Sequence, residues 1–222
     1  MENQKLPRPT QADYDRILQL EDTNNYYDEY MELSDSFDWS AQTFEKNGKY
    51  GLKSAVGELL LPAEYDNFKT MGGDILRRGN RVTAQKNGKW GVALANGNET
   101  TWHLQPQYDY IGYPNYLTAV CKDGKWGIIN MSTREYLIAP DCDMVHTDNG
   151  ILFVNRLGLY EKNGKIGVVR MDGAFTEAIF EETDFEPEGP IKVMFNGEWG
   201  FINEQGSFTT NEEDDVWWFS VE

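Results

Sequence analysis

The sequence has few of the features that commit a chain to a membrane, a secreted compartment or a disulfide framework. Its longest unbroken apolar runs are about four residues, whereas ~18 are needed to span a bilayer. The first residues lack the basic start and apolar stretch of a signal peptide. Only two cysteines are present, Cys121 and Cys142, and a single bond between them stays open because sequence does not place their Cβ atoms. We therefore expect a cytoplasmic protein that contacts no membrane.

Recognisable catalytic and metal motifs are also missing. There is no Gly-x-Ser-x-Gly, no Walker A loop and no Gly-x-Gly-x-x-Gly. Cys142 and His146 would supply two ligands, too few for a zinc site. Asp141 and Asp143 could hold Mg²⁺, but Asp143 occupies a repeated position, which favours a structural turn role. We expect no enzyme activity, no cofactor and no metal.

Basic side chains are outnumbered, with 20 Lys and Arg against 37 Asp and Glu, and the net charge is −17. Residues 1–45 carry 11 acidic and 3 basic side chains (−8), residues 46–180 carry 14 and 16 (+2), and residues 181–222 carry 12 and 1 (−11). The acid therefore gathers at the two ends. A surface this negative repels nucleic acid and anionic membranes, so we expect a basic protein as partner.

Five windows repeat one motif, Asn-Gly or Asp-Gly followed two residues later by an aromatic or aliphatic residue and a glycine. They span residues 46–52, 86–92, 122–128, 162–168 and 195–201. Such pairs favour a type I′ turn, because both of its central residues need φ > 0. The two-residue loop fixes the register, so Gln85 must face Trp90 and Lys86 must face Lys89. Facing lysines repel, and we expect them to be solvated at the hairpin tip.

A glycine recurs at one position inside the second strand of each hairpin. Glycine weakens a strand unless the space is needed, so we expect close approach of a neighbouring aromatic ring or a bulge at this point. We assign structural roles to Gly48, Gly51, Gly88, Trp90, Gly91, Gly124, Trp126, Gly127, Gly164, Gly167, Gly197, Trp199 and Gly200.

A weaker second element follows the first four hairpins, at residues 61–66, 104–109, 138–143 and 178–184. Three copies contain proline, which is confined to strand edges and strand ends. We expect each unit to hold a hairpin, a third strand, a proline turn and a brief fourth strand. Aligned acids of this element are Asp66, Asp109, Asp143 and Asp184.

Over residues 40–205 these windows resemble the WG-containing β-repeat family, named for its Trp-Gly pair and found mostly in bacterial proteins. Departures are Tyr50 and Ile166 in place of Trp, and Glu198 in place of Lys. The resemblance implies a repeat scaffold and no defined activity or catalytic residue.

The expected fold is mainly β: an open, twisted array of five hairpin repeats with a short N-terminal helical cap, or alternatively a small closed ring like a propeller. Three regions follow along the chain. They are an acidic helical cap at 1–39, the repeats at 40–205, and an acidic aromatic segment at 206–222.

Both ends admit two interpretations. Thr10 and Asp13 have the spacing of a helix cap, and a second helix is expected near residues 26–33. These residues either cap the array or bind a partner through Tyr26, Tyr27 and Tyr30, since tyrosine is enriched at interfaces.

The C-terminal segment either plugs the array as a last strand or binds a partner. Trp217 and Trp218 would point to opposite faces of a strand, so one of them would be buried. The residues proposed for binding are Glu212, Glu213, Asp214, Asp215, Trp217 and Trp218.

These observations favour a non-catalytic protein-binding module. The most concrete version is a cytoplasmic immunity or inhibitor protein that neutralises a basic toxin or effector, because opposite charge speeds association. Alternatives are a nucleic-acid mimic, which would need its acid on one folded face, and an enzyme with an unrecognised site.

Overall fold

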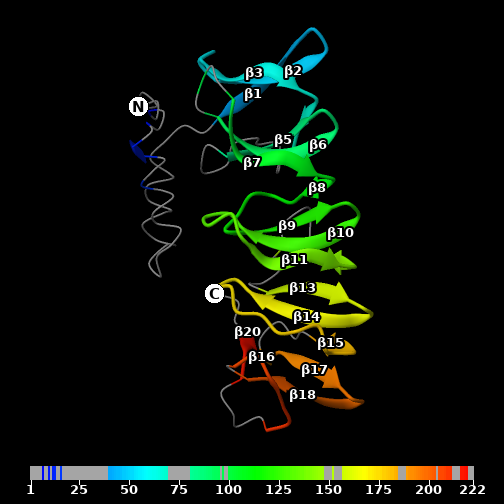
Figure 1. Ribbon diagram of the computed structural model, residues 1–222. Coiled ribbons are helices and arrows are strands. Elements are labelled where there is room, and N and C mark those ends of the chain that lie inside the picture. The colour runs from blue at the N-terminus through cyan, green and yellow to red at the C-terminus, as the bar shows by residue number, and fades with distance from the viewer. Residues whose placement is uncertain are drawn as a thin grey trace. The chain divides into compact units, whose positions relative to one another are not determined.

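Strands supply nearly all the regular structure of the residues that the structure describes (Figure 1). The computed structural model describes residues 7, 10, 12, 13, 16, 40–69, 81–95, 97, 100–147, 152, 157–184, 189–203, 205–211 and 216–219. The chain divides into unit 1, residues 1–116 with 131–134, and unit 2, residues 117–130 with 135–222. Within the described residues the strands form five open antiparallel sheets of three or four strands, and none closes on itself. The mainly β repeat architecture is confirmed.

Each repeat begins with a tight hairpin. The five pairs are β1 (Ala41–Lys46) with β2 (Lys49–Ser54), β5 (Arg81–Lys86) with β6 (Lys89–Leu94), β9 (Leu117–Lys122) with β10 (Lys125–Asn130), β13 (Leu157–Lys162) with β14 (Lys165–Arg170), and β17 (Lys192–Phe195) with β18 (Glu198–Ile202). In the second hairpin Asn87 has φ +54° and Gly88 has φ +77°, and the other four turns match. Gln85 faces Trp90 and Lys86 faces Lys89. The expected turn type and register are confirmed.

A third strand follows the hairpin in four repeats: β3 (Leu59–Tyr65), β7 (Thr101–Tyr108), β11 (Tyr136–Cys142) and β19 (Phe208–Thr209). In the fourth repeat, single bridges from Val169 to Phe175 and from Ile166 to Phe180 take its place. The expected proline turn is wrong, because the proline lies inside the third strand, as Pro106 does in β7. That strand is at the edge of its sheet, where a missing N–H costs no ladder bond.

The recurring glycine makes room for a bulge. Trp90 pairs with Tyr108 and Val92 pairs with Leu104, so β7 carries extra residues opposite Gly91. A Cβ on Gly91 would lie 2.6 Å from the Leu104 carbonyl oxygen. Elsewhere an aromatic ring occupies the space: at Gly51 a Cβ would come within 2.6 Å of the Phe44 ring. Both expected causes of the glycine therefore occur.

The brief fourth strand belongs to the next repeat, which corrects the expected four-strand unit. In unit 1, β4 (Asn67–Phe68) pairs with β5. In unit 2, β12 (Met144–Val145) pairs with β13, and β15 (Glu182–Asp184) pairs with β17. We call these short strands connector strands. The remaining strands are β8 (Tyr110–Ile111), β16 (Gly189–Pro190) and β20 (Trp218–Phe219), and β16 pairs with β20. Each connector strand therefore extends the sheet of the hairpin that follows it.

The hydrophobic core is shared between neighbouring repeats. In unit 1 one cluster joins two repeats and contains Leu52, Leu60, Leu61, Tyr65, Phe68, Val82, Ala84, Ala93 and Ala95. In unit 2 another contains Val168, Phe180, Ile191, Val193, Ile202 and Trp217. Burying one large aliphatic side chain contributes ~1.5–3 kcal/mol, so a repeat gains much of its stability from its neighbour.

Little of the expected N-terminal cap falls within the described residues. Thr10 and Asp13 form the reciprocal bonds of a helix cap: the Thr10 backbone N–H donates to Asp13 Oδ2 at 2.7 Å, and the Asp13 N–H donates to Thr10 Oγ1 at 3.4 Å. The helix expected near residues 26–33 lies outside the described residues. Among those that are described, no helix is long and apolar enough to cross a membrane.

Gly127→Ala should lower the free energy of unfolding by about 1–3 kcal/mol, because the added methyl group collides with backbone atoms that cannot rotate away. Its Cβ would lie 2.7 Å from the Ile138 carbonyl oxygen and 2.8 Å from the Pro140 nitrogen. Gly158→Ala is the matched control, since its nearest atoms belong to the movable Leu152 side chain at 3.0 Å. Urea unfolding measures both variants, and equal losses would contradict the bulge explanation.

Candidate functional site

In the first four repeats, the carboxylate that follows the third strand, or the bridges in its place, binds the lysine that follows the turn of its own hairpin. Lys125 Nζ lies 2.8 Å from Asp143 Oδ1, and Lys165 Nζ lies 2.8 Å from Glu181 Oε1. The complete set, which we call the connector carboxylates, is Asp66 with Lys49, Asp109 with Lys89, Asp143 with Lys125, and Glu181 with Lys165. Glu181, and not the expected Asp184, holds this position in the fourth repeat.

Three connector carboxylates also bind the turn of the next hairpin. Gly88 N–H donates to Asp66 Oδ2 at 2.9 Å, Asn163 N–H donates to Asp143 Oδ2 at 2.7 Å, and Gly197 N–H donates to Glu181 Oε2 at 3.1 Å. Lysine and amide donors favour the ionised form and lower the carboxyl pKa of all three acids. Each of these acids therefore links the lysine of its own hairpin to the turn of the next hairpin.

Lysines before the turn are paired as well. Lys86 Nζ lies 3.1 Å from Glu64 Oε1, and Lys162 Nζ lies 2.6 Å from Asp141 Oδ2. The expectation that tip lysines are merely solvated is therefore incomplete. The Asp141–Asp143 pair is held by lysines and a turn amide, which supports the structural role over Mg²⁺ binding.

In unit 1, a chain of hydrogen bonds links β3 of the first repeat to Thr100, which precedes β7 of the second repeat. Tyr65 Oη donates to Thr100 Oγ1 at 3.0 Å, and the Thr100 hydroxyl donates to the Glu64 carboxylate. Burial raises the pKa of Tyr65 to about 12, so the phenol stays protonated and keeps donating at neutral pH. The chain of bonds holds Thr100 against β3 and provides no group that titrates near pH 7.

Lys69 is a cation that the sequence interpretation missed. Its ammonium lies 3.3 Å from the Tyr110 ring centroid and 5.3 Å from that of Trp90, and it donates to the Ile111 carbonyl oxygen at 2.5 Å. Burial lowers the pKa of Lys69 to about 8. Its contacts bind the segment after β4 to β8, which is a packing role.

His103 on β7 is held neutral at pH 7. Its Nε2 lies 2.5 Å from the Met131 carbonyl oxygen, which can only accept, so Nε2 carries the proton. Burial lowers the pKa of His103 to about 4, and the nearby Arg81 charge acts in the same direction. With Nε2 committed to this bond, His103 positions residue 131.

Cys121 and Cys142 are both free and buried. They lie on β9 and β11 and face Trp126 of β10 from opposite sides. Neighbouring strands are ~4.8 Å apart, so their Cα atoms are about 10 Å apart, beyond the ~7 Å limit for a disulfide. Burial raises the pKa of the Cys142 thiol to about 11, which suppresses its thiolate. Within the described residues, no three His, Cys, Asp or Glu side chains gather as a metal site.

The residues proposed for partner binding divide into two groups. Tyr26, Tyr27, Tyr30, Glu212, Glu213, Asp214 and Asp215 lie outside the described residues. Trp217 is 2% exposed and packs in the core of unit 2, with the Arg170 guanidinium 5.1 Å from its ring centroid. Its burial agrees with the expectation that one of the two adjacent tryptophans is buried. Trp218 follows in β20.

The Trp-Gly aromatic is more exposed than its expected packing role implies. Trp199 is 45% exposed, and Tyr50 at the same position of the first repeat is 39% exposed. On unit 2, Trp199 lies in a row with Met194 and the exposed Glu182, because these residues face one another across three strands. We call this row the Trp199 row.

The preceding repeat of unit 2 carries a similar row. Met144, 45% exposed, faces Glu161, which in turn faces Ile166. Each row thus combines an exposed large apolar side chain with one carboxylate. The sequence did not predict either row, because the exposure of a side chain depends on how the neighbouring repeats pack against it.

Comparison with known proteins adds no assignment. No protein-family model matches the chain, and no curated protein matches its sequence. The structure establishes a repeated β unit of small antiparallel sheets.

Asp66→Asn should lower the free energy of unfolding by about 1 kcal/mol at pH 7, because a neutral amide binds Lys49 and Gly88 more weakly. The carboxyl pKa is lowered from 3.8 in the fold, so this stabilisation is present above pH 3.8 and is lost at lower pH. The difference from wild type should shrink as pH falls below 3.8. Glu58→Gln, at an exposed site, is the control, and an unchanged D66N stability curve would exclude the connector role.

His103 should titrate with a midpoint near pH 4 in an NMR titration of its ring protons. Its pKa is 6.5 when exposed, so between pH 6.5 and pH 4 the unfolded chain binds more protons, and stability falls as pH falls. In His103→Gln this part of the acid-induced loss should disappear. A midpoint near 6.5 would show that the ring is not buried.

Proposed function

We propose that this chain is a non-catalytic, acidic repeat protein of the WG-containing β-repeat type that binds another protein. The observation that carries the proposal is the Trp199 row. A tryptophan that is 45% exposed stands in the last repeat beside Met194 and Glu182. Tryptophan and methionine are enriched in interface cores, and tryptophan is a frequent hot spot.

The charge distribution supports a basic partner. Six tip lysines are paired with carboxylates of the same chain: Lys49, Lys86, Lys89, Lys125, Lys162 and Lys165. The repeats at residues 46–180 carry 14 acidic and 16 basic side chains, so this part of the sequence is close to neutral. Residues 181–222 carry a charge of −11, from 12 acidic and 1 basic side chains. This excess lies in the same part of the sequence as Trp199 and would speed association with a cationic surface.

The concrete version is a cytoplasmic immunity or inhibitor protein that blocks a basic toxin or effector. Toxins acting on anionic targets need basic surfaces, and an acidic binder competes for those surfaces. Trp199 would supply the apolar anchor, and the C-terminal carboxylates would provide the electrostatic attraction.

Affinity capture from the native host, followed by titration of the retained protein, tests the proposal. Trp199→Ala should weaken binding by about 30-fold, the effect of losing ~2 kcal/mol at a hot spot, and added salt should slow association. Tyr50→Ala is the matched control, because Tyr50 is the equivalent exposed aromatic of the first repeat. Circular dichroism checks that both variants fold.

Retention of no protein, or equal affinity of wild type and W199A, would contradict the proposal. For the immunity version, the captured protein should be basic and should arrest growth when expressed alone. Co-expression with the wild-type chain should restore growth more fully than co-expression with W199A.

A further inference from the structure

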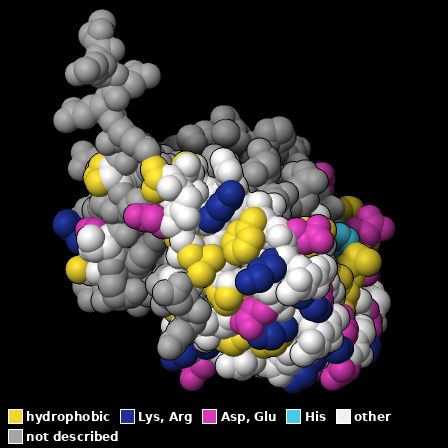
Figure 2. All heavy atoms as spheres, turned by 90° about the horizontal axis from the view of Figure 1, so that it is seen from above, with side chains coloured by type: hydrophobic (Ala, Val, Ile, Leu, Met, Phe, Trp, Pro, Cys, Tyr) yellow, Lys and Arg dark blue, Asp and Glu magenta, His cyan; other side chains and the backbone are white. Residues whose placement is uncertain are grey.

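Exposed apolar side chains occur in both units, so exposure alone does not show which kind of partner a patch binds. They include Tyr50 in unit 1 and Phe175 and Trp199 in unit 2. Seen from above in Figure 2, hydrophobic side chains lie between basic and acidic ones. The chemistry of a partner therefore has to be argued from the rings and charges around each patch.

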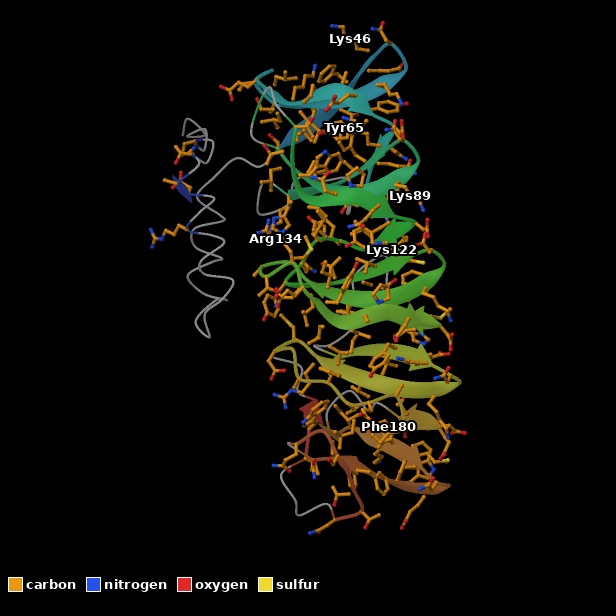
Figure 3. The ribbon with its side chains drawn as sticks, viewed as in Figure 1. Lys46, Tyr65, Lys89, Lys122, Arg134 and Phe180 are labelled. Atoms are coloured by element: carbon orange, nitrogen blue, oxygen red, sulfur yellow. The ribbon has the colours of Figure 1, made fainter. Side chains whose placement is uncertain are left out.

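One position of the second strand is fully buried in every repeat but the last. The residue after the Trp-Gly glycine is 0% exposed in the first four repeats, as Leu52, Val92, Ile128 and Val168. In unit 2, Val168 belongs to the core cluster with Phe180 of its own repeat and Val193 of the next, and Figure 3 shows Phe180 between β14 and β17. Phe201, the equivalent residue of the last repeat, is only half-buried.

We call the side of the last sheet that carries Phe201 the Trp199 face. Strand alternation and register place the Trp199 row on it and, one row further, Asp184, Lys192 and Phe201, which face one another across three strands. Trp199 and the two acids are exposed, and the other three side chains are half-buried. The face thus combines two aromatic rings and a thioether with two carboxylates and one ammonium group.

The second repeat shows what an aromatic ring at this position binds. Trp90 holds the place of Trp199 there, and Lys69 holds the place of Asp184, three residues after the connector carboxylate. The Lys69 ammonium lies 5.3 Å from the Trp90 ring centroid and 3.3 Å from that of Tyr110. The negative face of an aromatic ring attracts a cation at such distances. The Trp-Gly tryptophan of the second repeat therefore binds a cation from its own chain.

The last repeat carries acids where earlier repeats carry lysines. Asp184 stands in the place of Lys69, and Glu198 stands in the place of the lysine that follows each earlier turn. Both acids are exposed, as is Glu182. Because Lys192 faces Asp184 across the sheet, the excess negative charge beside the exposed indole comes from Glu182 and Glu198. Such a surface attracts a cationic side chain and repels an anionic one.

We propose that the Trp199 face binds an arginine side chain of the protein partner. The guanidinium lies over the Trp199 ring, the aliphatic stem lies on Met194, and the N–H groups donate to Glu182. Neighbouring strands are ~4.8 Å apart, so the Cα atoms of Trp199 and Glu182 are about 10 Å apart and one long side chain reaches both. Arginine suits these contacts, because its guanidinium stacks on aromatic rings and pairs with carboxylates through two N–H groups.

This inference rests on the proposed function, since it names the group of the partner that Trp199 recognises. The partner's arginine does between two proteins what Lys69 does within the second repeat. A second copy of the chain is a poorer occupant, because two copies with a net charge of −17 repel each other.

Titration of the full-length chain with a short arginine peptide tests the site without the partner. In NMR spectra of the labelled chain, the indole N–H signal of Trp199 should shift on binding. The Trp90 signal should shift less, because Lys69 lies over that ring. A citrulline peptide of the same length is the matched control, since citrulline has the shape of arginine without its charge. It should leave the Trp199 signal in place at concentrations where the arginine peptide saturates the shift.

Variants separate the ring from the charge. Trp199→Leu keeps an apolar side chain and should weaken binding of the arginine peptide about fivefold, the effect of losing ~1 kcal/mol of cation–π attraction. Asp184→Lys should abolish binding, because the new ammonium group occupies the place that Lys69 has in the second repeat. Glu177→Lys makes the same change in charge at an exposed site outside the Trp199 face, and this control should bind as wild type does. The remaining indole signals report whether each variant keeps its fold.

Equal affinity of wild type, W199L and D184K for the arginine peptide would overturn the proposal, as would equal binding of the citrulline peptide. Self-association of the chain that W199L abolishes, measured by sedimentation, would assign the face to a second copy and would overturn it as well.

The protein captured from the host distinguishes this inference from the proposed function. If that protein loses affinity for W199A but binds Glu182→Gln and D184K as tightly as wild type, it docks through apolar contact alone. This result would overturn the arginine site and leave the proposed function standing. Capture of no protein would contradict the proposed function, while the peptide titration would still decide whether the Trp199 face binds arginine.

Discussion

The connector carboxylate is the interaction on which the repeat structure depends. One side chain accepts from the lysine of its own hairpin and, in three repeats, from a turn amide of the next. Its backbone N–H begins the connector strand that extends the following sheet. Because the turn amides at an Asn-Gly tip have no ladder partner, the acid satisfies them and fixes where the next hairpin begins.

The glycine bulge makes this contact possible. The extra residues of the third strand opposite Gly91 place Tyr108 across from Trp90 at the end of the strand, so that Asp109 follows beside the hairpin tip. A side chain at the glycine would push the third strand away from the second. The Trp-Gly pair and the connector acid therefore depend on each other. The glycine leaves room for the bulge in the third strand, and the bulge places the acid beside the hairpin tip.

This arrangement also explains where function can lie. Six lysines at the hairpin tips form ion pairs with carboxylates. Tyr65 and His103 donate their protons in hydrogen bonds, and the two thiols are buried. The exposed apolar side chains of the described residues include Trp199 and Met144, and the proposed binding role rests on Trp199 together with the acidic sequence of residues 181–222.

The sequence by itself determined the local structure: the type I′ turns, the register of facing residues such as Gln85 and Trp90, and the need for space at the glycine. These follow from φ preferences and strand alternation, which act over a few residues. Only the tertiary structure decided that Pro106 lies inside a strand and that the connector strand joins the next sheet. It also decided that Glu181 replaces Asp184, that Trp217 is buried and that Trp199 is exposed. Each of these depends on a partner distant in the sequence, which no local pattern specifies.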